Sequence, residues 1–412
     1  MKKKYIFLVI VFLLAAAVYL LLFHKDKTLK FIPENADVVV LVDVKKVTRQ
    51  YISELIAHPS QWFKSDKKGK DKMSLNKSGM KIPDFIQIFH LKNTQFGDWY
   101  TIVELEDETQ FSQYLKQNKF IKSGEKLFRK DGLFISIEGA ACILGTSNAA
   151  FEDIRKSLLS DSKNNILNAN QLINNSDGSI SFISGSKISN FSISLNSDEI
   201  EVANSGNTNT FTSLISKLEQ KTQFLSAELD EKNVKNGLQF FNKDVKDSLQ
   251  ISYFKTNSEL EEVNDTIITY GYDDDFNETE KVSYQKIIQP NFIISLQSLN
   301  PYKTWNFFQN KKWINDQNQF TAIPVQPNRI LKKAKEISIQ STRKPLQLPQ
   351  NQNENYIFLR NNKLLSSSFH QLNSTQKMIL SNINYVFYGN KGQNYFMKIK
   401  LKENELPLLL RL

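Results

Sequence analysis

The sequence predicts an α+β protein: one N-terminal transmembrane helix followed by a large, mostly antiparallel sheet-based domain whose rhythm would fit two related halves. Three observations lead to this prediction. The chain opens with an uninterrupted apolar run, Tyr5–Phe23. Short strand patterns bounded by turn residues then recur along the chain. Finally, 40% hydrophobic and 11% aromatic residues in a chain of 412 provide enough apolar surface for one large core or two ordinary ones.

The run Tyr5–Phe23 has the length of a membrane-spanning helix. Its 19 residues would rise roughly 28 Å, close to the thickness of the bilayer hydrocarbon core. A cleavable signal has a shorter apolar core followed by small residues at the cut site, whereas the only small cluster here, Ala15–Ala17, lies inside the run. We therefore favour an uncleaved signal anchor, with a cleaved signal peptide as the alternative and a buried core helix as the least favoured interpretation.

This interpretation sets the domain organisation and the expected location. The segments are a cytoplasmic tail (1–4), a transmembrane signal anchor (5–23), a linker (24–30), a first α+β half (31–205) and a second α+β half (206–412). Lysines flank the apolar run on both sides, so the positive-inside rule separates the two orientations only weakly. A three-lysine tail before a long apolar run is the usual layout of an export signal. We therefore expect a single-pass protein of the inner membrane with its large domain in the periplasm, while a cytoplasmic domain stays open.

Strands and helices alternate through the first half. Val38–Val42 is continuously apolar, which predicts a strand buried on both faces with Val40 fully buried. The period then changes, and residues 44–56 predict a helix. Further strands are expected at 99–106, in a meander over 126–147 with a turn at Asp131-Gly132, and at 179–204; further helices are expected at 107–117 and 148–159.

From about Thr210 the rhythm restarts. Helices are expected at 211–221 and from Pro301 onward, a loop at 340–354, and strands at 222–227, 249–254, 266–272, 281–288, 291–299, 356–359, 385–388 and 395–401. A strand, a helix and the letters QNK occur in both halves, at Gln117–Lys119 and Gln309–Lys311. This pattern suggests two related α+β halves.

The charge distribution indicates possible partners. The chain carries a net charge of +10, and the stretch Lys64–Lys81 holds seven lysines against two aspartates. One interpretation is attraction to acidic lipid headgroups or to an envelope protein. The simpler one is a solvated loop that is dispensable for folding. Nucleic acid is not an expected partner, because no aromatic residue is interleaved with these lysines and arginine is rare.

No motif assigns catalytic, cofactor-binding or metal-binding residues. The single cysteine, Cys142, stands in an apolar stretch and is expected to be a small core residue. His24, His58, His90 and His370 lie far apart and form no close-spaced ligand pair, and His90 is expected at the end of a strand.

One acidic cluster deserves a comparison with calcium loops. Asp273, Asp275 and Asn277 have the 1-3-5 spacing of such a loop, but Glu278 and Tyr284 stand where glycine and glutamate are required. Because predicted strands flank the cluster, we favour a solvated hairpin tip.

The residues after the apolar run do resemble a known group. Ile32–Asp43 reads IPENADVVVLVD and directly follows an export-type segment. It resembles the start of uncharacterised envelope proteins of Bacteroidota, in which an Ile-Pro-x-x-Ala entry leads into a strand ending in Val-Asp and then a helix. Many of those proteins carry a lipid-attachment cysteine, which this segment lacks. The resemblance implies an envelope location and an α+β fold, and it implies no catalytic residues.

These observations favour a membrane-anchored extracytoplasmic protein that binds or scaffolds in the cell envelope. The alternative is an extracytoplasmic hydrolase whose site is assembled from residues distant in sequence. A pocket with clustered Asp, Glu, Ser and His would favour the hydrolase. A broad apolar surface or an open sheet edge would favour binding.

Overall fold

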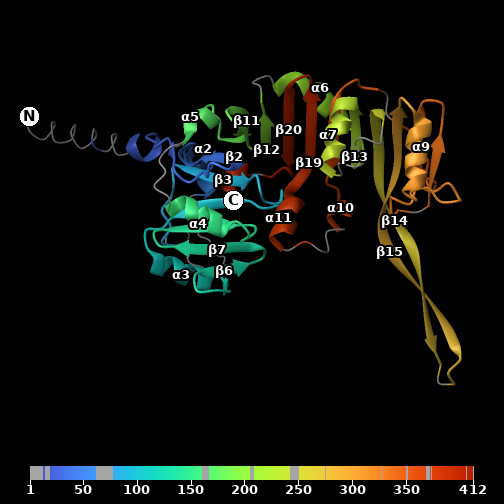
Figure 1. Cartoon of the computed structure of the whole chain (residues 1–412), viewed down its shortest axis with the longest axis horizontal. Helices are drawn as coiled ribbons and strands as arrows, with labels where there is room; N and C mark the ends of the chain where they lie inside the picture. Colours follow the sequence, from blue (N-terminus) through green and yellow to red (C-terminus); the bar gives the residue numbers. More distant parts are fainter. Residues whose placement is uncertain are drawn as a thin grey trace, which may run out of the picture. The chain divides into compact units, whose positions relative to one another are not determined.

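The chain divides into two compact units. Unit 1 comprises Met1–Ser205 and Asn404–Leu412, and unit 2 comprises Gly206–Glu403. The computed structural model describes residues 13, 19–61, 78–159, 167–204, 208–241, 250–273, 275–325, 327–348, 351–367, 372, 374–404 and 406–411. Each unit is rich in antiparallel strands, with helices packed beside them (Figure 1).

The predicted transmembrane helix is contradicted. Within the described part of the chain, no helix is long and apolar enough to cross a membrane. Of the segment Tyr5–Phe23, residues 5–12 and 14–18 lie outside the described residues. Its described end contacts a helix of unit 1, where Arg49 Nη1 donates a hydrogen bond to the carbonyl oxygen of Leu22. High hydropathy is a local property, whereas a span requires a continuous helix of about 20 residues. The fold class is therefore corrected to a sheet-rich, antiparallel architecture.

Unit 1 is built around one antiparallel sheet. Its strands, helices and helical turns are β1 (Thr28–Leu29), β2 (Ala36–Asp43), α2 (Val44–Ala57), η1 (Pro59–Gln61), β3 (Phe85–Leu91), β4 (Tyr100–Glu104), α3 (Glu108–Gln117), β5 (Ile121–Lys122), β6 (Leu127–Lys130), β7 (Leu133–Glu138), β8 (Ala141–Gly145), α4 (Phe151–Leu159), β9 (Leu167–Asn168), α5 (Ala169–Leu172), β10 (Gly178–Ser184), β11 (Lys187–Leu195), β12 (Glu199–Ala203) and η5 (Leu408–Leu410). β1 pairs with β9 outside that sheet.

β2 is an interior strand, hydrogen-bonded to β3 on one side and to β10 on the other. Its central position confirms the prediction, but its two faces are covered unequally. Val39 and Leu41 are fully buried, whereas Val40 is only half-buried. The prediction that Val40 is fully buried is therefore wrong. A strand of an antiparallel sheet can pack one face on the core and leave the other partly solvated, even where both faces carry apolar residues.

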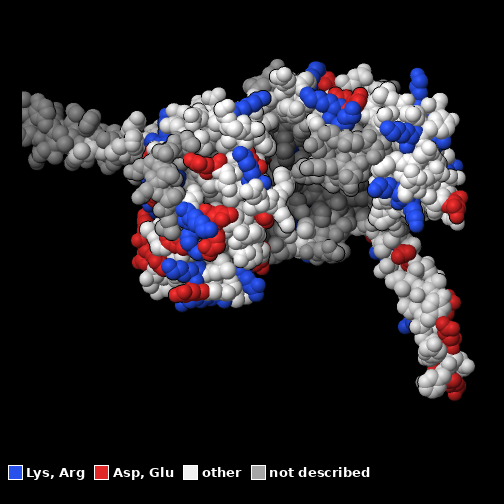
Figure 2. Space-filling model, in the orientation of Figure 1, with Lys and Arg blue, Asp and Glu red and all other residues white. Residues whose placement is uncertain are grey.

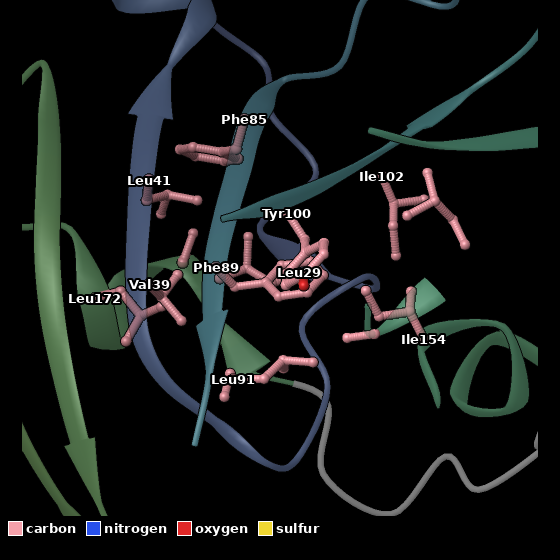
Figure 3. Packing of buried hydrophobic residues seen from close by; sticks show 14 of the residues in the cluster. Leu29, Val39, Leu41, Phe85, Phe89, Leu91, Tyr100, Ile102, Ile154 and Leu172 are labelled. Carbon is pink, nitrogen blue, oxygen red and sulfur yellow. The ribbon is translucent and has the colours of Figure 1, made fainter. Parts of the chain in front are cut away.

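The main core of unit 1 lies against β2, β3 and β4 (Figure 3). Figure 3 labels ten of its members: Leu29, Val39, Leu41, Phe85, Phe89, Leu91, Tyr100, Ile102, Ile154 and Leu172. A second cluster forms where Phe111 and Leu115 of α3 pack on β6, β7 and β8, and it contains the buried Cys142. The prediction that this cysteine is a core residue is confirmed.

Unit 2 is also built around one antiparallel sheet. Its elements are η4 (Thr208–Phe211), α6 (Thr212–Glu219), β13 (Leu225–Asp230), α7 (Glu231–Phe241), β14 (Ile251–Tyr272), β15 (Glu278–Ser298), α9 (Pro301–Asn310), β16 (Asn328–Lys332), β17 (Glu336–Ser341), β18 (Asn355–Arg360), α10 (Lys363–Ser367), α11 (Ser374–Asn382), β19 (Ile383–Lys391) and β20 (Asn394–Leu401). Its core joins Phe292 and Leu296 of β15 to Phe308 of α9 and to Ile337 and Ile339 of β17.

The two units have the same strand order. In unit 1 the order is β7–β8–β4–β3–β2–β10–β11–β12, with β5 and β6 added outside β7. In unit 2 it is β16–β17–β15–β14–β13–β18–β19–β20. Helices follow equivalent strands: α2 follows β2 as α7 follows β13, and α3 follows β4 as α9 follows β15. Equivalent positions in the two units can therefore be compared directly.

The first helix starts in the same way in both units. β2 and β13 each end in an aspartate whose Oδ1 accepts a hydrogen bond from the backbone N–H three residues later. Asp43 accepts from Lys46 at 2.8 Å, and Asp230 accepts from Asn233 at 2.9 Å. An aspartate in this position satisfies one of the free N–H groups of the first helical turn.

The helices α3 and α9 also end alike. The second residue after each helix has a left-handed backbone: Lys119 has φ of 64° and Lys312 has φ of 57°. Lys119 is therefore equivalent to Lys312. The shared letters Gln117–Lys119 and Gln309–Lys311 are one residue out of register, so that short match does not align equivalent positions.

Most predicted elements are confirmed to within a few residues. The helix at 44–56 is α2, the helix at 107–117 is α3, and the Asp131-Gly132 turn joins β6 to β7. The main error is in β14 and β15. The separate strands expected between 249 and 299 are two long strands that run without interruption.

The lysine-rich stretch Lys64–Lys81 lies outside the described residues as far as residue 77. Its last residues are packed into unit 1, where Ser78 and Gly79 are buried and Met80 bridges to Leu105. Dispensability for folding is therefore not expected to extend to residues 78–81.

Gly79→Ala is expected to destabilise unit 1 by about 1–3 kcal/mol. Gly79 has φ of +77°, and a Cβ there would lie 2.5 Å from the carbonyl oxygen of Asp107 at the start of α3. Gly132→Ala is the matched control, because Gly132 has φ of +81° with no heavy atom near the Cβ position. Urea unfolding of both variants should show the larger loss for Gly79→Ala. Equal losses would mean that only the backbone angle matters and that the close contact relaxes.

Candidate functional site

The β14–β15 hairpin continues far beyond the rest of unit 2. β13 pairs with β14 only as far as Ser258, and β17 pairs with β15 only from Ile293 onward. Beyond these points β14 and β15 pair only with each other, as far as Tyr272 opposite Glu278. Figure 1 shows this two-stranded ribbon projecting from unit 2. Residues 262–287 are called the arm below.

One face of the arm is aromatic and exposed. Directly opposed residues of a hairpin lie on the same face, and side chains alternate between faces. Ile268 opposes Val282, and the same face continues with Tyr270, Tyr272 and Tyr284. Tyr272 is 73% exposed and Tyr284 is 76% exposed. These five side chains are called the aromatic face. The opposite face carries mainly small and polar residues, among them Thr269, Ser283 and Gln285.

The arm is acidic, whereas the chain as a whole is basic. Residues 262–287 contain seven Asp or Glu and two Lys, which gives a net charge of −5 within a chain of +10. Glu278 and Glu280 share the aromatic face with the tyrosines. Figure 2 shows acidic side chains along the ribbon and at its end. Lys286 is paired with Glu262 at 2.6 Å, and this hydrogen bond raises the pKa of the lysine.

The predicted acidic cluster lies at the tip of the arm. Asp273 Oδ1 accepts hydrogen bonds from the backbone N–H groups of Asp275 and Asn277, at 3.0 and 2.8 Å. The bond from Asn277 is the main reason why the pKa of Asp273 is lowered. The carboxylate therefore closes the turn, as the hairpin-tip interpretation predicts. Phe276 is 86% exposed at the same turn and extends the apolar surface.

The base of the arm contacts the residues that directly follow β17. Arg343 Nε lies 2.8 Å from Glu261 Oε1 on β14, and the same guanidinium donates to Gln289 on β15. Lys344 Nζ lies 2.9 Å from Glu259 Oε2, and the carbonyl of Lys344 accepts from Asn291 Nδ2 at 2.8 Å. One short segment thus contacts both strands of the hairpin. The direction in which the arm leaves the unit is set by these contacts.

Among the histidines that the structure describes, His90 has a carboxylate next to its ring, as a catalytic histidine would. Its Nδ1 lies 2.7 Å from Asp37 Oδ1, and its Nε2 lies 3.0 Å from the carbonyl oxygen of Gln95. Thr94 Oγ1 is 3.4 Å from Nε2 but donates its proton to the carbonyl of Leu91 at 2.8 Å. Both ring nitrogens face oxygen acceptors, so His90 holds a strand end in place, as predicted. His24 and His58 lie elsewhere in unit 1, and His370 lies outside the described residues.

Unit 1 contains an open hollow of about 620 Å³. It is lined by Phe31, Lys81, Glu104, Leu105, Glu138, Gly139, Ala140, Ala141, Arg155 and Leu158. Its charged side chains are paired with one another, Lys81 with Glu104 at 2.5 Å and Arg155 with Glu138 at 2.7 Å.

These pairings also fix the charge states in the hollow. The hydrogen bond to Glu104 raises the pKa of Lys81. Burial opposes ionisation of Glu138, but hydrogen bonds from Arg155 and Ser136 outweigh it and lower the pKa of that carboxyl. Both shifts favour the charged forms, so the pairing makes Lys81 a weaker acid and Glu138 a weaker base than the free side chains.

Over the described ranges of the chain, neither the cysteine nor a metal site adds a candidate for catalysis. Burial raises the pKa of the Cys142 thiol to about 12, so this cysteine is not a thiolate nucleophile. Among the residues that the structure describes, no group of three or more His, Cys, Asp and Glu is placed to hold a metal ion. The sequence contains one signal for the aromatic face: Ile268, Tyr270 and Tyr272 stand at alternate positions, and so do Val282 and Tyr284 in the returning strand.

Comparison with known proteins adds no relative: no family model, no curated protein and no solved structure matches this chain.

Proposed function

We propose that this protein binds or scaffolds another protein in the bacterial cell envelope, outside the cytoplasm, and that it does so through the arm. The export-type run Tyr5–Phe23 and the resemblance carried by Ile32–Asp43 support the location. The aromatic face of the arm is the single observation that supports binding. Exposed aromatic residues gathered on one surface are typical of protein interaction sites.

The arm is an addition to the shared strand arrangement. Leu91 at the end of β3 is equivalent to Glu259 on β14, and Tyr100 at the start of β4 is equivalent to Ile293 on β15. In unit 1 the two strands are connected by residues 92–99, whereas in unit 2 the connection is 260–292. The equivalent strands in unit 1 are therefore joined by a short connection. The longer connection in unit 2 is not needed to form the sheet, which suggests another role for it.

An isolated two-stranded ribbon is marginally stable in water, because it cannot cover its own side chains. The arm carries three exposed tyrosines and an exposed phenylalanine. Tyrosine contributes a large, rigid contact area that loses little conformational entropy on binding. A partner protein that covers the aromatic face would stabilise the arm and would itself be held by it.

The test of this function is photo-crosslinking of the full-length protein in the cells that produce it. A photo-reactive phenylalanine analogue at position 284 is expected to give cross-links to protein. The same analogue at position 283, on the opposite face of the same strand, is expected to give at least about fivefold fewer. Equal yields from the two positions, or none from either, would refute binding through the aromatic face.

Removing the arm is expected to leave the fold intact. Replacing residues 263–287 by an Asn-Gly turn connects the opposed pair Glu262 and Ile288, keeps the base contacts of Glu259 and Glu261, and should shift the melting temperature by no more than a few degrees, since the arm buries little apolar surface. Circular dichroism melting of the full-length and shortened chains would check this. A loss of cooperative unfolding in the shortened chain would show that the arm is part of the folded body.

A further inference from the structure

We propose that the partner of the arm is a second copy of this chain. The aromatic face of one copy docks on a basic surface beside α9 of the other copy. This inference rests on the proposed function, since it names the protein that the arm binds.

The receiving surface is formed by the start of α9 and the end of β16. Lys332 Nζ lies 4.1 Å from the centre of the Tyr302 ring, which joins the strand to the helix. The backbone N–H of Ser298 donates to the carbonyl of Lys335 at 3.1 Å, which brings the next turn to the same place. Leu299 and Tyr302 are exposed there together with Lys303, Lys332 and Lys335. These five residues are called the basic patch.

The charges of the two surfaces are complementary. Residues 299–335 contain seven Lys or Arg and one Asp, a net charge of +6, against −5 for the arm. Figure 2 shows basic side chains around the position that α9 occupies in Figure 1. Two arms would repel each other through Glu278 and Glu280, so pairing of arm with arm is disfavoured. Both surfaces also carry tyrosine and aliphatic side chains, which gives a docked pair an apolar centre with a charged rim.

An arm cannot reach the basic patch of its own chain. β15 runs from the arm toward α9 as one strand, with Tyr284 in its arm portion and Leu299 directly after its last residue. At about 3.3 Å per residue, the intervening strand separates them by about 50 Å. Docking of the arm on the patch therefore joins two molecules.

The positions of the two surfaces favour a closed pair. The arm extends from one end of β15 and the patch lies beyond the other end. When two copies lie antiparallel, each arm reaches the patch of the other copy, and a twofold axis relates the two contacts. Such an isologous arrangement uses both surfaces of both copies and leaves none free to add a third.

The first test is the mass of the purified full-length chain, measured by light scattering. The expected mass is twice the 47.6 kDa of the chain. A mass of one chain at tens of micromolar overturns the inference, and so does an open series of larger assemblies.

The second test is a charge exchange. Glu278→Lys with Glu280→Lys on the arm is expected to weaken dimerisation at least about tenfold, and so is Lys303→Glu with Lys335→Glu on the patch. Combining all four changes in one chain should restore the dimer to within about threefold of the original. Failure of the combined variant to recover, with each pair still folded by circular dichroism, would contradict this docking site.

The third test separates this inference from the proposed function. A mixture of unlabelled and ¹⁵N-labelled protein carrying the photo-reactive analogue at position 284 should give cross-linked peptides of mixed label that contain residues 299–303 or 332–335. If position 284 cross-links to another protein while the chain stays monomeric, the arm binds but its partner is not a second copy. Binding to anionic phospholipid vesicles that is lost in Tyr284→Ser, in place of dimerisation, would overturn the inference in favour of a lipid surface.

Discussion

Leu41→Asp is expected to unfold unit 1. Leu41 is fully buried in β2, between β3 and β10, and packs in the core shown in Figure 3. An aspartate there would be a buried charge without a partner, or would have to take up a proton to avoid ionising. Either result costs several kcal/mol, comparable to the whole free energy of unfolding of a typical domain.

Because the chain has two units, the loss of structure can be assigned to one of them. Hydrogen–deuterium exchange of Leu41→Asp should show loss of protection in peptides of β2, β3 and β10, while β14 and β17 in unit 2 stay protected. Val40→Asp is the matched control, because Val40 is the adjacent residue on the half-buried face. It should be tolerated with a much smaller loss. Equal loss of protection in the two variants would mean that the two faces of β2 are equally buried, contrary to the half-buried position of Val40.

Glu228→Leu is expected to destabilise unit 2 by about 3–5 kcal/mol. Glu228 on β13 is fully buried, and its carboxylate accepts hydrogen bonds from the backbone N–H groups of Gln352 and Asn353 and from the hydroxyl of Tyr253. Lys255, also buried, lies 3.8 Å away. Burial lowers the pKa of Lys255, and the charge of Glu228 opposes that shift. Removing the carboxylate leaves the lysine without its counter-charge and the backbone donors without their acceptor.

A double variant separates these two causes. Glu228→Leu combined with Lys255→Met removes both charges, so the part of the loss due to an unpaired lysine should be recovered. The part due to the unpaired N–H groups of Gln352 and Asn353 should remain. Urea unfolding of the two single variants and the double variant measures both parts. A loss below about 1 kcal/mol in Glu228→Leu would show that the cluster is more hydrated than the structure indicates.

Elements with a clear start signal could be predicted from sequence. Asp43, Asp107 and Asn300 each precede a helix and each accept a hydrogen bond from a backbone N–H of its first turn. Such caps are local, since they involve residues only three apart, and a short window of sequence contains them. The sequence predicts α2 and α3 from apolar residues at helical spacing and α9 from Pro301 in its first turn, and the three caps are a second local signal at the same starts.

The long strands could not be predicted because part of their core is polar. Thr256, Asn257 and Ser258 are buried in β14, where a strand from sequence would need apolar residues. Their side chains donate to backbone carbonyls: Thr256 to Ile293 at 3.0 Å and Ser258 to Asn291 at 3.0 Å. These partners are distant in sequence, so hydropathy alone placed a break in the strand. The transmembrane prediction is also wrong, because no helix within the described residues is long and apolar enough to cross a membrane.

The alternating residues of the arm predict a strand face but not whether that face is covered. The alternation of Ile268, Tyr270 and Tyr272 was readable, and it marks one face of a strand. How far the two edges of the hairpin are paired depends on how far β13 and β17 extend alongside, and whether a helix covers the face depends on long-range packing; the sequence states neither. The arm is recognised as an addition because the equivalent strands of unit 1, β3 and β4, are joined by the short connection 92–99. That comparison requires the strand order of both units.

The pairing of the arm also sets which way its tyrosines point. Successive cross-strand pairs alternate between the two faces of a ribbon, so deleting one pair near Glu262 would turn Tyr270, Tyr272 and Tyr284 to the opposite side relative to unit 2. Deleting two pairs would restore their direction and shorten the reach by about 7 Å. The length of the arm is therefore constrained by parity as well as by distance: only an even number of pairs can be gained or lost while the same surface is presented.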